Sequence, residues 1–209
     1  MKARPILFSS TMVSAILEDR KTQTRRAIKP RKDWLYGCSL APNELAGEVN
    51  GGQYHNCPHG EPGALMWVRE EHYRFGHWEP VPTMRTRLGR QKWRFVPDSD
   101  ELRYTPPVSF RRGRHHKDPT TPAWHKRIAR FMPRSASRIT LEITGIHAEK
   151  LRDISETDAT AEGTPHSLYM PAGRTAVENF AHLWECLHGE GSWRANPWVW
   201  VVTFRRIDT

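Results

Sequence analysis

The sequence predicts a small β-barrel or an α+β fold for this chain of 209 residues. It contains several short apolar runs typical of strands, two or three stretches with helical spacing, and no regular alternation between the two kinds. No glycine-rich phosphate fingerprint follows an expected strand, which disfavours a Rossmann sheet. The chain is long enough to bury a core, either as one large domain or as a small domain with insertions.

The N-terminal elements are expected to be a strand and a helix. Residues 5–8 form a short apolar run, which favours a first strand. A helix is expected next, because three apolar residues fall on one face: Val13, Ile16 and Leu17. Residues 19–26 read Asp-Arg-Lys-Thr-Gln-Thr-Arg-Arg, and we place them at the end of this helix because Pro30 prevents it from continuing.

The middle of the chain is expected to be irregular, with one clear strand. Residues 30–63 show little periodicity and contain Pro, Gly, Asn and Cys, which predicts a long insertion. Residues 65–69 read Leu-Met-Trp-Val-Arg and predict a strand. Residues 76–134 are rich in Arg, Lys, His and Pro, and within them only residues 93–96 are expected to form a strand.

Regular structure is expected to return towards the C-terminus. Residues 139–144 alternate between apolar and polar and predict a half-buried strand. Ser155 is expected to cap a short helix that ends at Gly163. Residues 175–187 have the spacing of a helix, and residues 198–204 predict a central strand because they are rich in Trp and Val.

The composition favours an anionic partner. The chain has 32 Lys and Arg against 23 Asp and Glu, so its formal net charge is +9. We expect nucleic acid or a nucleotide before a membrane surface. The chain has neither an apolar run near the roughly 20 residues that span a bilayer nor the apolar region of a secretory signal at its N-terminus, so a cytoplasmic protein is expected. Its three cysteines are odd in number and sparse, which argues against a disulfide framework.

Residues 19–26 combine groups that suit chemistry on a phosphate-bearing ligand. Arg25 and Arg26 can attract phosphate, and a lysine near a threonine, such as Lys21 near Thr24, can activate the hydroxyl as a nucleophile. The alternative interpretation is a solvated basic end of a helix.

A second basic stretch runs from residue 111 to residue 138, with Trp124 and Phe131 within it. Basic side chains next to aromatic rings suit a single strand or a looped RNA, because phosphates bind the charges and bases stack on the rings. The alternative is a solvated insertion that keeps the protein soluble. The candidate phosphate contacts in this stretch are Arg112, Arg114, Lys126, Arg130, Arg134 and Arg138.

A weak zinc motif lies in the first insertion. Cys38, His55, Cys57 and His59 are residue types that bind zinc, although His-x-Cys-x-His is an uncommon spacing. The alternative is a buried cysteine beside surface histidines. We therefore expect no metal and no cofactor.

The order of these features resembles the ASCH superfamily of small β-barrels related to the PUA RNA-binding domain. The family signature is Gly-x-Lys-x-x-Thr-x-Arg, and Lys21, Thr24 and Arg26 match it, with Asp19 in place of the glycine. The turn and strand at 62–68 and the later elements follow in the family's order. Residues that resemble extended ASCH proteins of phages and prophages are Trp-Val-Arg-Glu at 67–70, Pro-Arg-Ser-Ala-Ser-Arg-Ile at 133–139 and Asn-Pro-Trp-Val-Trp-Val at 196–201. The resemblance implies one PUA-like domain over residues 1–209, with flanking helices and insertions at about 30–62 and 76–132.

Within this superfamily, the bacterial acetylcytidine amidohydrolases use a Lys, a Thr and a Glu. Lys21 and Thr24 match the first two, and Ala-Thr-Ala-Glu at 159–162 resembles the segment that carries the third. The resemblance therefore implies a cleft for RNA, a nucleotide or a modified nucleoside, with Lys21, Thr24 and Glu162 as catalytic residues for amide hydrolysis. Three alternatives stay open: a ribonuclease, a non-catalytic nucleic-acid-binding module, and a phage accessory protein that acts through a protein partner.

Overall fold

The computed structural model describes residues 3–113, 118–164 and 173–207 and has a mixed α+β fold. The chain divides into two compact units. The first unit comprises residues 1–6, 10–68 and 138–209, and the second comprises residues 7–9 and 69–137. Across the described ranges, every helix is too short or too polar to cross a membrane.

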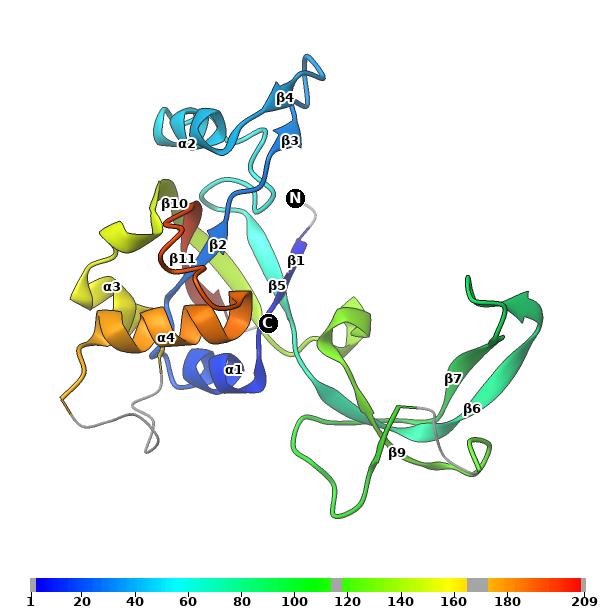
Figure 1. The fold of residues 1–209 in the computed structure, drawn as a ribbon. Coiled ribbons are helices and arrows are strands. Elements are labelled where there is room, and N and C mark those ends of the chain that lie inside the picture. Colours follow the sequence, from blue (N-terminus) through cyan, green and yellow to red (C-terminus); the bar gives the residue numbers. More distant parts are fainter. Residues whose placement is uncertain (1–2, 114–117, 165–172, 208–209) are drawn as a thin grey trace. The chain divides into compact units, whose positions relative to one another are not determined.

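A five-stranded sheet forms the centre of the first unit (Figure 1). Its strands, in spatial order, are β1 (Arg4–Leu7), β5 (Leu65–Arg69), β10 (Thr140–Lys150), β11 (Trp198–Ile207) and β2 (Gln23–Ala27). β11 pairs antiparallel with both β10 and β2, as expected for a central strand, and residues 199–202 are fully buried. β1 and β2 are the two edges, and no sheet of the described residues closes into a barrel.

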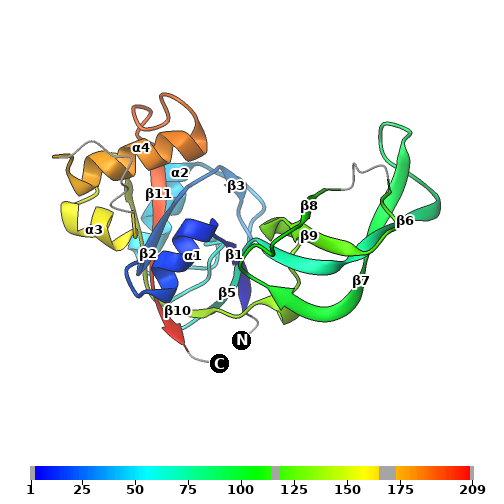
Figure 2. The same cartoon turned by 90° about the horizontal axis from the view of Figure 1, so that it is seen from below.

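In the described part of the first unit there are four α-helices: α1 (Ser10–Leu17), α2 (Pro42–Asn50), α3 (Glu156–Ala161) and α4 (Ala176–His188). Hydroxyl side chains cap two of these helices, since Ser155 and Thr175 accept hydrogen bonds from backbone N–H groups in the first turns of α3 and α4. Figures 1 and 2 show α3 and α4 side by side. Both helices bury apolar residues in one cluster with η3 (Leu151–Asp153) and β11: Leu151, Ile154, Ala159, Phe180, Trp184, Val199 and Val201.

Two expectations for the first unit are wrong. Residues 19–26 do not lie at the end of a helix, because α1 stops at Leu17 and the chain turns at Asp19, whose φ is 55°. The next residues then form β2, paired with β11, so the tertiary sheet decides the conformation of this polar segment. The 30–62 region is also more regular than expected, since it contains β3 (Arg31–Lys32), β4 (Ser39–Leu40) and α2.

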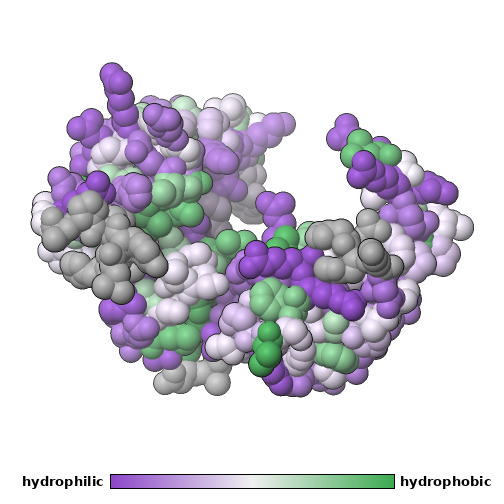
Figure 3. Space-filling model, turned by 60° about the horizontal axis from the view of Figure 1, so that its bottom comes forward, coloured by the Kyte–Doolittle hydropathy of each residue, from purple (hydrophilic) through white to green (hydrophobic). Residues whose placement is uncertain are grey.

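The second unit contains a four-stranded sheet in the order β7-β6-β9-β8. These strands are β6 (His72–Arg85), β7 (Gln91–Arg103), β8 (Arg111–Arg112) and β9 (Ala123–Arg127), and the short helices η1 (Ala129–Phe131) and η2 (Arg134–Ala136) follow. The expectation of a single strand at 93–96 is therefore wrong. The sequence does not predict these strands, because their many polar residues are solvated and break the alternation with apolar ones. Arginine side chains cover some of the aromatic rings instead, as Arg127 does over Phe95 at 4.3 Å. Figure 3 shows hydrophilic residues over much of the face it presents, with hydrophobic patches between them.

Candidate functional site

Lys21 and Glu162 form a buried ion pair in the first unit. The Lys21 Nζ lies 2.7 Å from Glu162 Oε2, and the two side chains are 0% and 4% exposed. The same ammonium donates to the backbone oxygens of Gln23 and Glu162, each at 2.8 Å. The structure thus brings together two residues that lie 141 positions apart and that the sequence analysis proposes for one cleft.

The backbone explains how this pair comes together. Lys21 and Glu162 form an isolated antiparallel bridge, so the end of α3 pairs with the segment that leads into β2. Gly163 follows with φ +68°, and a Cβ at this position would lie 2.6 Å from the Cβ of Lys21 and 2.9 Å from that of Ala15. A glycine is therefore required both by the backbone conformation and by the close approach.

Arg25 belongs to the same buried network. Its side chain is 0% exposed and lies 2.7 Å from Glu149, 3.3 Å from Asp158 and 3.3 Å from Glu162. Gln23 also donates to Asp158, at 3.0 Å from Oδ1. The expectation that Arg25 binds phosphate is therefore corrected, because its guanidinium is enclosed by three carboxylates. Neither Glu149 nor Asp158 was predicted from the sequence as part of this network.

Thr24 lies on β2 opposite Val202 and is 3% exposed. Thr24, Arg25, Arg26 and Glu162 line a cavity of about 30 Å³, which also has Met12 of α1 and residues of α4 in its wall. The α4 residues are Phe180, Leu183, Trp184, Leu187 and His188. A volume of this size holds about one water molecule, so the cavity is too small for a nucleoside as it stands. The sequence-predicted catalytic side chains thus lie in one place, although the cavity they share is small.

Burial changes the proton affinity of these groups. Desolvation lowers the pKa of the Lys21 amine, and the ion pair with Glu162 opposes this effect. Desolvation also lowers the pKa of Arg26, against an opposing attraction to Glu162. Desolvation raises the pKa of Glu149, but hydrogen bonds from His147 and Arg25 outweigh it and leave the pKa below its ordinary value. These shifts favour the charged form of the Glu149 carboxylate and disfavour the charged forms of Lys21 and Arg26.

The remaining basic candidates lie on other elements. Arg112, Arg130, Arg134 and Arg138 are exposed, and Arg112 lies over the ring of Phe110 at 5.8 Å. Lys126 is bound to Glu71 at 2.7 Å, so a phosphate would have to displace that carboxylate. Arg114 lies outside the described residues.

The sequence reasoning missed a second group of cations. Four exposed or partly exposed basic residues surround the turn between β6 and β7, where Gly89 has φ +72°: Arg85, Arg87, Arg90 and Lys92. In the sequence these residues form a run of basic side chains around a glycine, within a region that is expected to be an irregular insertion.

The sequence-predicted zinc ligands do not converge. Among the described residues, only one group of His, Cys, Asp and Glu has its ligand atoms within 4.8 Å of one another, and it consists of Asp33, Glu48 and His55. It shares only His55 with the predicted set. Cys38 is exposed and Cys57 is buried, and burial raises the pKa of the Cys57 thiol.

No family model, curated protein or solved structure matches this chain.

Proposed function

We propose that this protein binds RNA or another single-stranded nucleic acid through its second unit. The observation that carries the proposal is the uneven distribution of positive charge between the two units. Residues 69–137 contain 16 Lys and Arg against seven Asp and Glu, a net charge of +9, whereas the rest of the chain has 16 of each. The entire formal excess of the protein therefore belongs to the second unit. A concentrated positive charge of this kind attracts a polyanion.

The arrangement of individual cations supports the same proposal. Most carboxylates of the second unit already have partners, as in the pairs of Arg94 with Glu79 and Lys126 with Glu71. Among the described residues, no carboxylate lies within 4.0 Å of the basic group of Arg87, Arg90, Lys92, Arg130 or Arg134. These side chains can therefore bind phosphates without breaking an ion pair.

Aromatic rings beside arginines add a means of binding bases. Arg103 lies over Trp124 at 4.5 Å and Arg127 over Trp78 at 5.1 Å. Both rings are partly exposed. Stacking on rings and guanidinium planes is tolerant of sequence and suits unpaired bases, so we favour a single strand over a duplex. A PUA-like relationship of the first unit agrees with RNA as the partner and stays a prediction of the sequence.

Salt dependence tests this proposal. The triple variant Arg87→Gln, Arg90→Gln, Lys92→Gln is expected to weaken binding of a labelled 20-nucleotide RNA and to reduce the slope of log K against log salt by about 2, because each lost phosphate contact removes about 0.7. The measurement is fluorescence anisotropy over a range of salt concentrations.

A matched control removes the same charge from the first unit, with Lys29→Gln, Arg152→Gln, Arg194→Gln at exposed positions. This variant should retain the slope of the wild type. An equal loss in both triple variants would mean that only net charge matters, and the second unit would no longer be the proposed binding surface.

A second candidate function is hydrolysis at the cavity lined by Thr24 and Glu162, as the ASCH resemblance implies. Three acceptors surround the Lys21 ammonium, which matches the number of protons that it carries. This arrangement supports a role in which Lys21 holds Glu162 in place, while the Thr24 hydroxyl and the Glu162 carboxylate line the cavity. The lowered pKa of Lys21 makes a proton transfer easier than in water.

The variant Thr24→Val tests this second candidate because it keeps the size of a buried strand residue and removes only the hydroxyl. We expect at least about a hundredfold loss of turnover on acetylated cytidine, the usual scale for a nucleophile or proton-transfer group. Thr22→Val is the control at an exposed position. Turnover is measured by chromatography as the release of acetate and cytidine. If the wild-type protein shows no turnover, the hydrolase function is wrong.

A further inference from the structure

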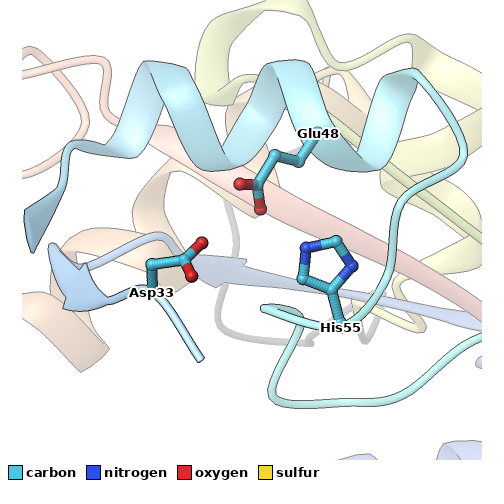
Figure 4. A group of neighbouring side chains, drawn as sticks. All are labelled: Asp33, Glu48 and His55. Atoms are coloured by element: carbon cyan, nitrogen blue, oxygen red, sulfur yellow. The ribbon is translucent and has the colours of Figure 1, made fainter. Parts of the chain in front are cut away.

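Three side chains outside the candidate site converge on one space in the first unit. Figure 4 shows Asp33, Glu48 and His55 pointing towards one another. Their nearest ligand atoms all lie within 4.8 Å of one another. Asp33 comes from the β3–β4 turn, Glu48 from α2 and His55 from the loop that follows α2. Three separate segments thus contribute one ligand each.

The local backbone fixes these positions. The Asp33 Oδ1 accepts hydrogen bonds from the backbone N–H groups of Leu35 and Tyr36, at 2.7 and 2.6 Å, which holds the turn and directs the carboxylate. The Asn56 Nδ2 donates to Asp33 at 2.9 Å and to both oxygens of Glu48, at 3.2 and 2.9 Å. Asn56 is therefore a positioning residue that draws the two carboxylates together.

The charges of this group are not balanced by the protein. Among the described residues, neither Asp33 nor Glu48 has an ammonium or guanidinium nitrogen within 4.0 Å. The Asp33 side chain is nevertheless largely buried, since the residue is 7% exposed. The donors that support this carboxylate are the Asn56 amide and the backbone N–H groups of Leu35 and Tyr36. Two converging carboxylates supported mainly by neutral donors leave room for a cation to stabilise the group.

We propose that Asp33, Glu48 and His55 bind a divalent transition-metal ion. Carboxylate oxygens combined with one imidazole nitrogen suit ions such as Mn²⁺, Fe²⁺ or Zn²⁺ better than Ca²⁺, which prefers oxygen ligands alone. Ligand atoms around one such ion, with bonds of about 2.1 Å, lie at most about 4.2 Å apart. The donor atoms must therefore move closer together when the ion binds, and the side chain of His55 is exposed and free to adjust. Each carboxylate keeps lone pairs for the ion after accepting from Asn56.

A large cavity adjoins one of the three proposed ligands. His55 also lines a cavity of about 830 Å³ in the first unit, together with Arg4, Gln53, Tyr54 and Glu61. Three protein ligands leave coordination positions open for water or a bound molecule, as in metal sites that act on substrates. The inference does not depend on the proposed nucleic-acid binding, because its residues lie in the first unit and carry no part of that argument.

Titration with Mn²⁺ alone tests the proposal. The full chain, stripped with a chelator and dialysed, is titrated calorimetrically, and the bound ion is observed by electron paramagnetic resonance. Mn²⁺ is chosen because Zn²⁺ could also bind His182 and Cys186, whose side chains lie 3.7 Å apart on α4. We expect one bound ion and a rise in melting temperature when it is added.

Two variants remove single ligands. His55→Ala removes an exposed imidazole, and Glu48→Gln keeps an acceptor for Asn56, so both proteins should fold as judged by circular dichroism. Each is expected to weaken Mn²⁺ binding by at least about tenfold. The control Glu44→Gln lies on the same helix, where the side chain binds only the N-cap backbone of α2, and should bind Mn²⁺ like the wild type. Undetectable binding at about 1 mM Mn²⁺, or equal affinity in wild type and both ligand variants, would overturn the site.

Discussion

Replacing Glu162 by alanine is expected to lower the free energy of unfolding by about 3–5 kcal/mol, the scale found when one partner of a buried ion pair is removed. The substitution leaves the Lys21 ammonium in a fully buried place without its carboxylate, and it also removes one of the three carboxylates around Arg25. Lys21 would still donate to two backbone oxygens, but these neutral groups do not neutralise the buried positive charge. Urea unfolding followed by circular dichroism measures the change.

Two further variants make this prediction sharp. Glu190→Ala removes an exposed carboxylate near the end of α4 and should change stability by less than about 0.5 kcal/mol. The double variant Lys21→Met, Glu162→Leu removes both charges and should recover much of the loss, because no isolated charge remains buried. A Glu162→Ala protein as stable as Glu190→Ala would mean that the ion pair is solvated rather than buried.

Acidification from pH 6.5 to about 4 is expected to destabilise the protein by up to about 3 kcal/mol through His59 alone. Desolvation lowers the pKa of His59 to about 4, and the positive charges of Arg26, Arg4 and Arg31 act in the same direction. The unfolded chain binds a proton on this imidazole below about pH 6.5, whereas the folded chain does so only near pH 4. Stability is therefore highest above pH 6.5 and falls as the pH decreases through this window.

The variant His59→Gln isolates this contribution. The difference in unfolding free energy between pH 6.5 and pH 4 should be smaller in the variant than in the wild type by the amount stated above. Burial also lowers the pKa values of His72 and His188, but both groups are present in the two proteins and cancel in the comparison. His182→Gln, at an exposed position on α4, is the control. Identical pH profiles for wild type and His59→Gln would show that His59 is solvated in the folded protein.

Elements with a strong local pattern were predictable. β5 matches the expected strand at 65–69, and α4 agrees with the expected helix at 175–187 within one residue at each end. Both have apolar residues at the period of their structure and clear signals at their ends. α2 and the long β6–β7 hairpin were not predicted, because α2 has no side-chain cap at Ala41 and the hairpin consists largely of solvated polar residues.

The candidate site was predicted in part. Lys21, Thr24 and Glu162 were proposed together from a motif, and the structure places Lys21 against Glu162 and Thr24 beside Glu162 in one cavity. The role of Arg25 could not be predicted from the sequence, because nothing in the local sequence distinguishes two adjacent arginines. Only the fold determines which of them is enclosed by carboxylates. On β2, both arginines line the cavity, but only the side chain of Arg25 lies against three carboxylates.

The sequence by itself predicted a small β-barrel or an α+β fold and determined the excess of basic residues, and a resemblance of short motifs put Lys21, Thr24 and Glu162 in one candidate site. Only the tertiary structure decided that Gln23–Ala27 form an edge strand instead of a helix end, and that Asp33, Glu48 and His55 converge. The physical reason is that charge and local periodicity are properties of short segments, whereas burial and ion pairing depend on segments that meet only after folding. A lysine in a sequence is a solvated cation by default, and it becomes a buried partner of a glutamate 141 positions away only through the sheet and helix that enclose both.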